Sequence, residues 1–256
     1  QQHYRAFQKY IQYNPNKETE PNRLEERFTG WHRANFDALL NFDRQFGEHG
    51  LKAMAGWHTE KYDYTYNQQF RKNFPTNDLT DIAAGDAATQ KNNGYTRELA
   101  MISWFGRINY DYAGKYYVSG SFRRDGSSRL SRDSRWGNFW SVSGSWRLSQ
   151  EAFMESLSNV ITDAKIRASY GVNGTQPKDY YGYMGVYEFG YNYNGNGGSS
   201  EARFYNPSLK WEKNYATNIG IDLTLFNRLT VSAEWYNRET KDLLMDKPIS
   251  AAVGVI

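Results

Sequence analysis

The chain has 256 residues, and it combines an aromatic content of 17% with a strongly polar mean hydropathy of -0.84. Cysteine is absent, which excludes disulfide frameworks, thiolate catalysis and cysteine-ligated zinc. The formal net charge of +3 is too small to indicate a nucleic-acid partner, and we expect none.

No stretch approaches the roughly 18 consecutive apolar residues that a membrane-spanning helix needs, so the sequence predicts no such helix. The strands of a membrane barrel turn only alternate residues to lipid, which keeps their mean hydropathy low. The chain begins QQHYRAF, without an initiator Met or a charged-then-apolar leader, so we expect a processed chain or a fragment.

Alternation with a period of two dominates the chain and predicts β-strands. In residues 140–148, Trp140, Val142 and Trp146 share one face, while Ser141 and Ser143 share the other. The predicted strands run, in chain order, over 33–44, 50–60, 100–111, 116–125, 138–148, 164–173, 214–225 and 229–240, with a candidate ninth in 3–13. Lengths of about nine to eleven residues suit tilted strands that cross a bilayer, whereas strands of soluble sandwiches are usually shorter.

The predicted connections alternate in length. Tight turns fall at FGEHG, YAGK and FNR, and longer polar loops at 61–99, 126–137 and 174–213. Short periplasmic turns and long extracellular loops are typical of outer-membrane barrels. Residues 149–163 depart from this rule, because the helical spacing of Phe153, Leu157 and Val160 predicts a short amphipathic cap on the periplasmic side.

Aromatic side chains gather at the ends of the predicted strands. In a barrel they would form the two interfacial girdles, and the alternative is ordinary cross-strand pairing. The residues concerned are Trp57, Trp104, Tyr110, Tyr112, Tyr116, Trp136, Trp140 and Trp235.

Several long motifs occur in a fixed order that resembles the SusC/RagA family of TonB-linked (TonB-dependent) outer-membrane transporters. They are FDALLNFDRQFGEHGLKAMAGW, ISWFGRINYDYAGKYYVSGSFRRDGSSRL, WGNFWSVSGSWRLSQEAFM, AKIRASYGVNGTQ, NPSLKWEKNYATNIGIDLTLF and LTVSAEWYNRETKDLL. The resemblance runs from about Asn35 to Val255. Trp140 stands where the family pattern has a proline. This departure leaves the local bend of the chain undetermined, whereas the strand is still expected.

The resemblance implies an all-β, antiparallel, up-and-down transmembrane β-barrel in the outer membrane of a Gram-negative bacterium. Such a barrel has about 22 strands, so residues 1–256 are expected to form an incomplete part of it, about eight or nine strands from the middle of the wall. The plug domain and the C-terminal strands are expected to lie outside the chain. The implied partners are a SusD-like surface lipoprotein, the TonB-ExbB-ExbD system acting through the plug, outer-membrane lipids, and a glycan or peptide substrate.

Two segments of the expected extracellular loops are candidate contact sites. The basic segment RRDGSSRLSRDSR suits phosphate, but a solvated loop whose charges pair with one another is the preferred interpretation. The flat rings of the 174–213 loop offer stacking surfaces for sugars, peptides or a lid protein, or they pack on one another. Its tyrosines are Tyr180, Tyr181, Tyr183, Tyr187, Tyr191 and Tyr193. GNGGSS in the same loop is not a phosphate loop, because no strand is expected to lead into it and no Lys-Ser follows.

The predicted faces assign Trp140, Val142 and Trp146, with Ile166, Ala168 and Tyr170, to lipid, and Ser141, Ser143, Arg167 and Ser169 to the lumen. Charged side chains of the second face would line a water-filled interior and pair with one another or with the plug. These lumenal candidates are Arg107, Lys165, Arg167, Asp222 and Glu234. The four histidines have no metal-ligand spacing and no nucleophile elbow is present, so we expect neither an enzyme nor a cofactor.

The sequence thus favours TonB-dependent active import of glycan oligosaccharides or peptides, with this chain forming part of the wall and of the extracellular loops. One alternative is a passive structural or adhesive outer-membrane barrel. Another is a secreted β-sandwich carbohydrate-binding module.

Overall fold

The computed structural model describes residues 2–11 and 21–246, and nearly all of its regular structure is β-strand. The chain divides into two compact units. Unit 1 contains Gln1–Asn35 and Glu60–Ala100, and unit 2 contains Phe36–Thr59 and Met101–Ile256. Within the described residues, no helix has the length and apolar character needed to cross a membrane.

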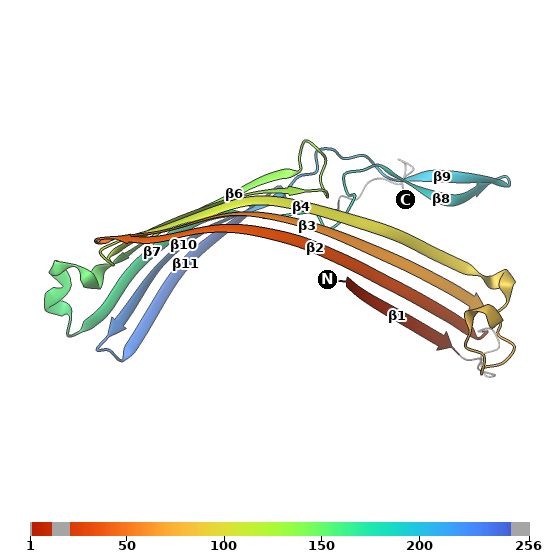
Figure 1. Cartoon of the computed structure of the whole chain (residues 1–256), viewed down its shortest axis with the longest axis horizontal. Coiled ribbons are helices and arrows are strands. Elements are labelled where there is room, and N and C mark those ends of the chain that lie inside the picture. The colour runs from red at the N-terminus through yellow and green to blue at the C-terminus, as the bar shows by residue number, and fades with distance from the viewer. Residues whose placement is uncertain (1, 12–20, 247–256) are drawn as a thin grey trace. The chain divides into compact units, whose positions relative to one another are not determined.

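All eight predicted strands are confirmed, and so is the ninth near the N-terminus (Figure 1). The strands are β1 (Gln2–Ile11), β2 (Arg23–Phe46), β3 (His49–Lys72), β4 (Lys91–Tyr112), β5 (Tyr116–Ser127), β6 (Trp136–Arg147), β7 (Ile161–Thr175), β8 (Val186–Tyr193), β9 (Asn196–Arg203), β10 (Glu212–Leu225) and β11 (Leu229–Lys241). Residues 12 and 13 of the predicted ninth strand lie outside the described residues.

Neighbouring strands follow chain order. In unit 2 the order is β2-β3-β4-β5-β6-β7-β10-β11, and in unit 1 it is β1-β2-β3-β4. The pairs β4–β5, β5–β6, β6–β7, β7–β10 and β10–β11 are antiparallel, as an up-and-down arrangement requires. Only β8 and β9 leave the series, because they pair with each other as a separate two-stranded sheet.

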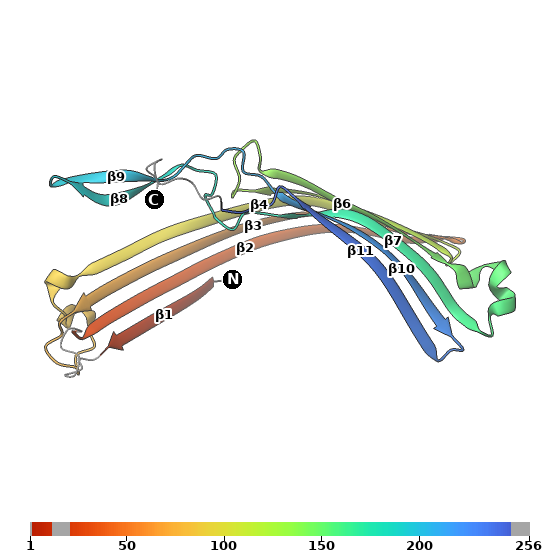
Figure 2. The same ribbon diagram turned by 180° about the vertical axis from the view of Figure 1, so that it is seen from behind.

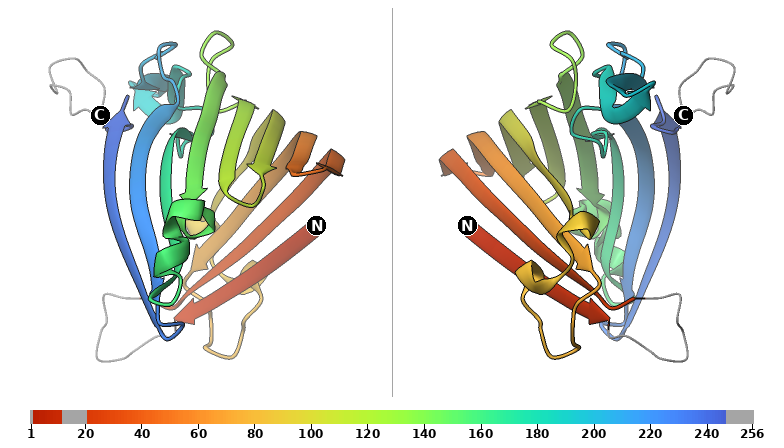
Figure 3. Two further views of the ribbon diagram at one scale, coloured as in Figure 1. Left: turned by 90° about the vertical axis from the view of Figure 1, so that its left-hand side faces the viewer. Right: turned by 90° about the vertical axis from the view of Figure 1, so that its right-hand side faces the viewer.

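The short connections of unit 2 lie together at one end of its strands, as the parity of the turns predicts (Figures 1 and 2). They join β2 to β3, β4 to β5, and β10 to β11. The predicted amphipathic cap lies at the same end as the short 3-10 helices η3 (Leu148–Gln150) and η4 (Ala152–Leu157), visible in Figure 3. Its side chains Phe153, Leu157 and Val160 are exposed.

The prediction of a loop over 61–99 is wrong. Strand β3 continues to Lys72 and β4 begins at Lys91, which leaves a connection of 73–90 containing the 3-10 turns η1 (Ile82–Ala84) and η2 (Ala87–Thr89). Strands β2, β3 and β4 therefore have 24, 24 and 22 residues, well above the expected length. Beyond residue 60, every residue of β3 except Phe70 is polar or tyrosine, so the apolar signal ends although the strands remain neighbours in the sheet.

Unit 1 holds its connection through side chains that bind backbone atoms. The Asn22 amide donates to the Phe74 carbonyl at 3.0 Å and accepts from the Phe74 N–H at 2.7 Å. The Arg71 guanidinium donates to the carbonyls of Ala83 and Gly85 at 3.0 and 3.1 Å. Asn22 and Phe74 are both buried, so these bonds fix the 73–90 connection to the residue that precedes β2.

The strand register divides the unit 2 sheet into two chemically distinct faces. One row of partners runs Ile108, Gly120, Val142 and Tyr170, and the adjacent row runs Asn109, Ser119, Ser143 and Ser169. The first belongs to an apolar face, whose exposed large side chains are Trp104, Ile108, Tyr110, Tyr112, Tyr116, Val118, Phe122, Trp140, Val142, Trp146, Ile166, Tyr170, Ile219, Ile221, Val231 and Trp235. The second belongs to a polar face, and the two sets agree with the predicted alternation.

Aromatic rings of the apolar face form contacts near both strand ends. At the end of the unit 2 strands that carries the short connections (the turn end), the ring of Tyr116 lies between those of Tyr112 and Trp146, with centroids 6.4 and 6.2 Å away. At the opposite end, which carries the long connections (the loop end), Trp104 stacks on Trp136 with ring centroids 5.3 Å apart. Residues 104 and 112 of β4 are about 27 Å apart along an extended strand. With the tilt of about 40° of a barrel strand, this length covers about 21 Å of the membrane normal, comparable with an apolar band of about 25 Å.

Candidate functional site

Serine and asparagine side chains pair across the centre of the polar face. The hydroxyls of Ser119 and Ser143 share a hydrogen bond of 2.6 Å, and those of Ser121 and Ser141 share one of 2.7 Å. The Asn218 amide donates to the Ser169 hydroxyl at 3.3 Å. The face therefore presents small hydroxyl and amide groups, which can exchange hydrogen bonds with water or with a passing polar solute.

Three of the five predicted lumenal residues form one charged group. Arg167 of β7 lies 3.1 Å (Nε to Oδ2) from Asp222 of β10 and 3.3 Å (Nη1 to Oε1) from Glu234 of β11. Lys165 lies two residues away on the same strand, with its Nζ 5.4 Å from the centre of the Tyr117 ring. The pairing expected among these side chains is thus present, and it joins three neighbouring strands.

Arg107 lies apart from that group, on β4. Its guanidinium donates to the Asn109 side chain on the same strand at 3.0 Å. It lines a hollow of about 350 Å³ together with hydroxyl and amide side chains that include Ser121, Ser141 and Asn218. A second hollow of about 580 Å³ is lined by Lys165, Arg167, Asn109 and Asp111, among others. The polar face is therefore indented at two places.

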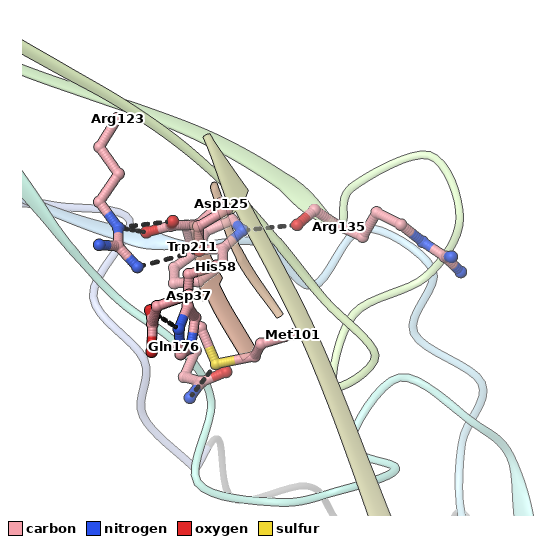
Figure 4. Close-up of polar contacts among 9 residues, drawn as sticks. Asp37, His58, Met101, Arg123, Asp125, Arg135, Gln176 and Trp211 are labelled. Atoms are coloured by element: carbon pink, nitrogen blue, oxygen red, sulfur yellow. Dashed lines mark hydrogen bonds and ion pairs between the residues drawn. The ribbon is translucent and has the colours of Figure 1, made fainter. Parts of the chain in front are cut away.

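Two connections pack together at the loop end of unit 2. Leu130, Phe139 and Trp211 form a buried apolar cluster, with Phe139 and Trp211 in edge contact at 5.3 Å. The Trp211 indole donates to the Arg135 carbonyl at 2.9 Å (Figure 4). The Ser131 hydroxyl donates to the Pro207 carbonyl at 2.8 Å. The connections 128–135 and 204–211 are thereby fixed to each other.

Two arginines of the basic segment 123–135, which begins within β5, bind neighbouring groups. Arg123 binds Asp125 at 2.6 Å and donates to the Ser103 hydroxyl at 2.9 Å (Figure 4). Arg129 donates to the Pro177 carbonyl at 2.9 Å, and its guanidinium lies 4.7 Å from the Tyr180 ring centre. The expected pairing of charges within the segment is present for Arg123, whereas Arg129 binds a backbone carbonyl and a tyrosine ring, and Arg124 is exposed.

The long connection 176–211 contains the hairpin of β8 and β9, which the sequence analysis did not predict. Figure 1 shows it extending from the loop end of unit 2. Its register shifts between Phe189 and Tyr191, where Gly190 has a left-handed φ of 104°. Strand β8 leads directly into GNGGSS, so the stated reason against a phosphate loop there is wrong; the missing Lys-Ser remains a valid one.

The shift at Gly190 separates tyrosines that the sequence places in one series. Tyr187 and Phe189 pair with Glu201 and Ser199 and share one face of the hairpin. Tyr191 falls on the other face, where its hydroxyl donates to Glu188 at 3.4 Å. The Tyr193 side chain lies outside what the structure describes. The aromatic side chains of the hairpin therefore lie on two surfaces, of which the one with Tyr187 and Phe189 is the more apolar.

The remaining tyrosines of the connection lie before the hairpin. The rings of Tyr180 and Tyr181 are 6.4 Å apart, and Tyr180 is covered in part by Arg129. Tyr183 accepts a hydrogen bond at its backbone carbonyl from the Asn206 N–H at 2.9 Å. Tyr180 and Tyr183 are half-buried, so they support the loop end rather than forming its outermost surface.

Sequence reasoning missed the residues that hold these surfaces in place. Trp211 and Pro207 reach the β5–β6 connection across more than seventy residues of sequence, and no local pattern signals such contacts. The contact between His58 Nδ1 and Asp37 Oδ1, which lie 2.7 Å apart, was likewise not predicted. Across residues 2–11 and 21–246, no three side chains of the metal-ligating types gather into a metal site.

The comparisons with known proteins fit this geometry. A family model described as TonB dependent receptor-like, beta-barrel matches residues 1–255. The chain belongs to this TonB-dependent receptor family. TonB-dependent receptor P39 of Formosa agariphila is 31% identical over 96% of this chain and 24% of its own length. TonB-dependent receptor SusC of Bacteroides thetaiotaomicron is 31% identical over 82% of this chain and 20% of its own length.

Solved structures agree with the receptor family. A structure described as the RagAB peptide transporter superposes with a TM-score of 0.88 at 25% identity, covering 99% of this chain and 28% of that one. The RagAB peptide importer in its open-open state gives a TM-score of 0.85. This receptor chain thus spans less than a third of the relatives it matches. The predicted SusC/RagA-type origin and the all-β, antiparallel barrel wall of limited extent are confirmed.

Proposed function

We propose that the chain forms part of the wall and the extracellular loops of an outer-membrane, TonB-dependent importer of glycan oligosaccharides or peptides. The observation that carries the proposal is the receptor-family match over residues 1–255. The plug and the remaining strands of the barrel belong to other parts of the protein. TonB-ExbB-ExbD would act through that plug, and the chain itself would supply no catalytic group.

The two faces of unit 2 support an assignment to lipid and lumen. A sheet face that exposes Val142, Ile166 and Ile219 between aromatic rows is suited to hydrocarbon. The opposite face, with its serine pairs and the Arg167 ion pairs, is suited to water. The interior would then be lined by Arg107, Lys165, Arg167, Asp222 and Glu234. Of these, Arg107 lies apart from the charged group around Arg167.

The loop end would face the outside of the cell. It holds the long connections and the β8–β9 hairpin, whose exposed Tyr187 and Phe189 provide flat apolar surface. Such rings stack on sugars and pack against peptides, and they could also contact a SusD-like lipoprotein lid. Peptide enters the proposal because the RagAB relatives are described as a peptide transporter and importer, and glycan enters from the sequence resemblance.

Uptake by intact cells tests the proposal. Cells with and without the gene would be given fluorescently labelled peptides and oligosaccharides, each in a strain with TonB and in one without it. We expect gene-dependent uptake of one substrate class that stops when TonB is removed. Uptake that continues without TonB would instead support the passive barrel.

Protease accessibility tests the orientation separately. Cleavage in the 176–211 connection on intact cells is expected. Cleavage that requires a broken outer membrane would place the loop end in the periplasm.

A further inference from the structure

A groove of about 600 Å³ crosses the apolar face of unit 2. Its large side chains are Leu40, Phe42, Ile108 and Phe122, and all four are exposed. Between them lie Ala53, Gly106 and Gly120, whose small size lowers the surface. Volumes of about 300–1,000 Å³ are typical of small-molecule sites, so the groove has room for part of a lipid chain.

The glycines leave this space unfilled. A Cβ placed on Gly120 would have the Ser141 carbonyl oxygen, 4.0 Å away, as its near neighbour. A Cβ on Gly106 would lie 3.3 Å from the Met54 carbonyl oxygen. No left-handed φ requires a glycine at either position. Backbone geometry thus permits larger residues at Gly120, and the hollow follows from the small residues themselves.

The groove leads to an exposed arginine. Arg124 stands opposite Trp104 in the β4–β5 register, and the next row on the same face pairs Phe122 with Gly106. Successive residues on one face are about 7 Å apart, so Arg124 lies one residue row beyond the loop end of the groove. Its Cζ is 5.2 Å from the centre of the Trp136 ring. Among the described residues, no carboxylate lies within ion-pair distance of Arg124, whereas the neighbouring Arg123 is paired with Asp125.

We infer that this face binds one phosphorylated lipid of the outer leaflet, with its phosphate on Arg124 and an acyl chain in the groove. The inference rests on the proposed function in placing the apolar face in lipid and the loop end outside. Tryptophans such as Trp104 and Trp136 sit at headgroup level in membrane proteins, and an arginine fork suits a phosphate. Gly106 and Ile108 lie about 7 and 13 Å further into the membrane along β4, at the depth of the upper acyl chain.

Native mass spectrometry of the detergent-purified protein tests the inference, with phosphatidic acid as the probe. We expect one bound phosphatidic acid whose dissociation constant rises about ten-fold in Arg124→Gln and again in Gly120→Leu, which fills the groove. Arg124→Lys should retain part of the affinity because the charge remains. Gly144→Leu is the matched control: it lies on the same face, its Cβ would meet only the Tyr117 carbonyl oxygen at 3.8 Å, and it does not line the groove.

Three results would overturn the lipid site. The first is unchanged phosphatidic acid affinity in Arg124→Gln or Gly120→Leu, in protein that still resists unfolding by SDS. The second is displacement of the lipid by inorganic phosphate alone, which would make Arg124 a free-phosphate site. The third is a dimer that Gly120→Leu dissociates, which would assign the groove to a second copy of the chain. Failure of the proposed function would instead appear as uptake without TonB. It would not affect the measurement of bound phosphatidic acid by native mass spectrometry, so the two failures are distinguishable.

Discussion

Gly220 of β10 makes room for Arg167 of β7: a Cβ at residue 220 would lie 2.8 Å from the Arg167 Cζ. Gly220 is the register partner of both Arg167 and Glu234. The guanidinium can therefore extend across β10 and reach the Glu234 carboxylate on β11, as well as Asp222. The glycine is what allows one arginine to bridge three strands.

Gly220→Ala should weaken the Arg167–Glu234 pair while leaving the barrel assembled. The Arg167 side chain is flexible and partly exposed, so the loss of unfolding free energy should be small. A double-mutant cycle with Arg167→Gln and Glu234→Gln measures the coupling between the two side chains, which we expect to disappear when Gly220→Ala is added. An unchanged coupling would mean that Arg167 reaches Glu234 by another route.

Val142→Arg should destabilise the barrel by about 2 to 4 kcal/mol, because the side chain lies midway along the apolar face proposed to contact lipid. Val142 is exposed there, between its partners Gly120 and Tyr170. Unfolding of the protein in lipid vesicles by guanidinium measures the change. Ser143→Arg, on the adjacent residue of the polar face, is the control and should cost less than half as much. The opposite order would exchange lipid and lumen.

Glu151 should make the turn end acid-sensitive. It lies between η3 and η4 and accepts hydrogen bonds from the Tyr116 hydroxyl at 2.6 Å and the Trp146 indole at 3.0 Å, with Lys115 Nζ at 3.3 Å. The bonds from Tyr116, then those from Trp146 and Lys115, hold the pKa of this carboxyl below its usual value. Their stabilising effect is therefore fully present above about pH 4.3 and is lost as the pH falls through the lower, folded-state pKa.

Glu151→Gln should remove that acid-dependent part of the unfolding free energy. The free energy of unfolding would be measured about every half pH unit between pH 6 and pH 3. It should fall less steeply with decreasing pH in Glu151→Gln than in the wild type. Glu155→Gln in η4 is the control and should keep the wild-type slope. Equal slopes for wild type and Glu151→Gln would assign the acid sensitivity to other groups.

Period-two alternation predicts most of unit 2 because its two faces differ in chemistry. Val142 and Ser143 lie on opposite sides of β6, so adjacent letters of the sequence report opposite environments. The signal fails where both faces are polar, as around Tyr64 and Tyr66 of β3. There the rings stack on Tyr95 of β4, at 6.0 and 5.1 Å, and the pairing continues without an apolar stripe.

The candidate site was only partly accessible to sequence reasoning. Arg167 and Asp222 could be placed on the polar face from alternation, but Gly220, which determines how far Arg167 extends, carries no side-chain signal. In the hairpin, aromatic residues at 187, 189 and 191 suggest one face. The left-handed Gly190 shifts the register by one residue and moves Tyr191 to the other.

Trp211→Ala should release the connections at the loop end. The ring is 5% exposed and fills the cluster with Phe139, so its removal costs about 3 to 5 kcal/mol locally. We expect faster protease cleavage within 128–135 and 204–211 on intact cells, with the amount of assembled barrel unchanged. Trp211→Phe should give an intermediate rate because the bond to the Arg135 carbonyl and part of the ring volume are lost, while an aromatic ring remains in the cluster. Phe204→Ala, which removes an exposed ring of the same connection, should leave the rate unchanged.

The two faces of the β8–β9 hairpin should differ in their effect on uptake. Tyr187 and Phe189 are 61% and 84% exposed on one face, while the Tyr191 hydroxyl on the other face is bound to Glu188. Aromatic contacts contribute about 0.5 to 1.5 kcal/mol each beyond their buried area. Tyr187→Ala with Phe189→Ala should therefore lower uptake about five- to 140-fold at subsaturating substrate, without reducing the amount of protein at the cell surface. Tyr191→Ala is the matched control, and we expect its uptake to stay within about two-fold of the wild type. An equal loss from both faces would mean that the hairpin is surrounded by its partner, and no loss from either would mean that its rings contact neither the substrate nor a lid protein.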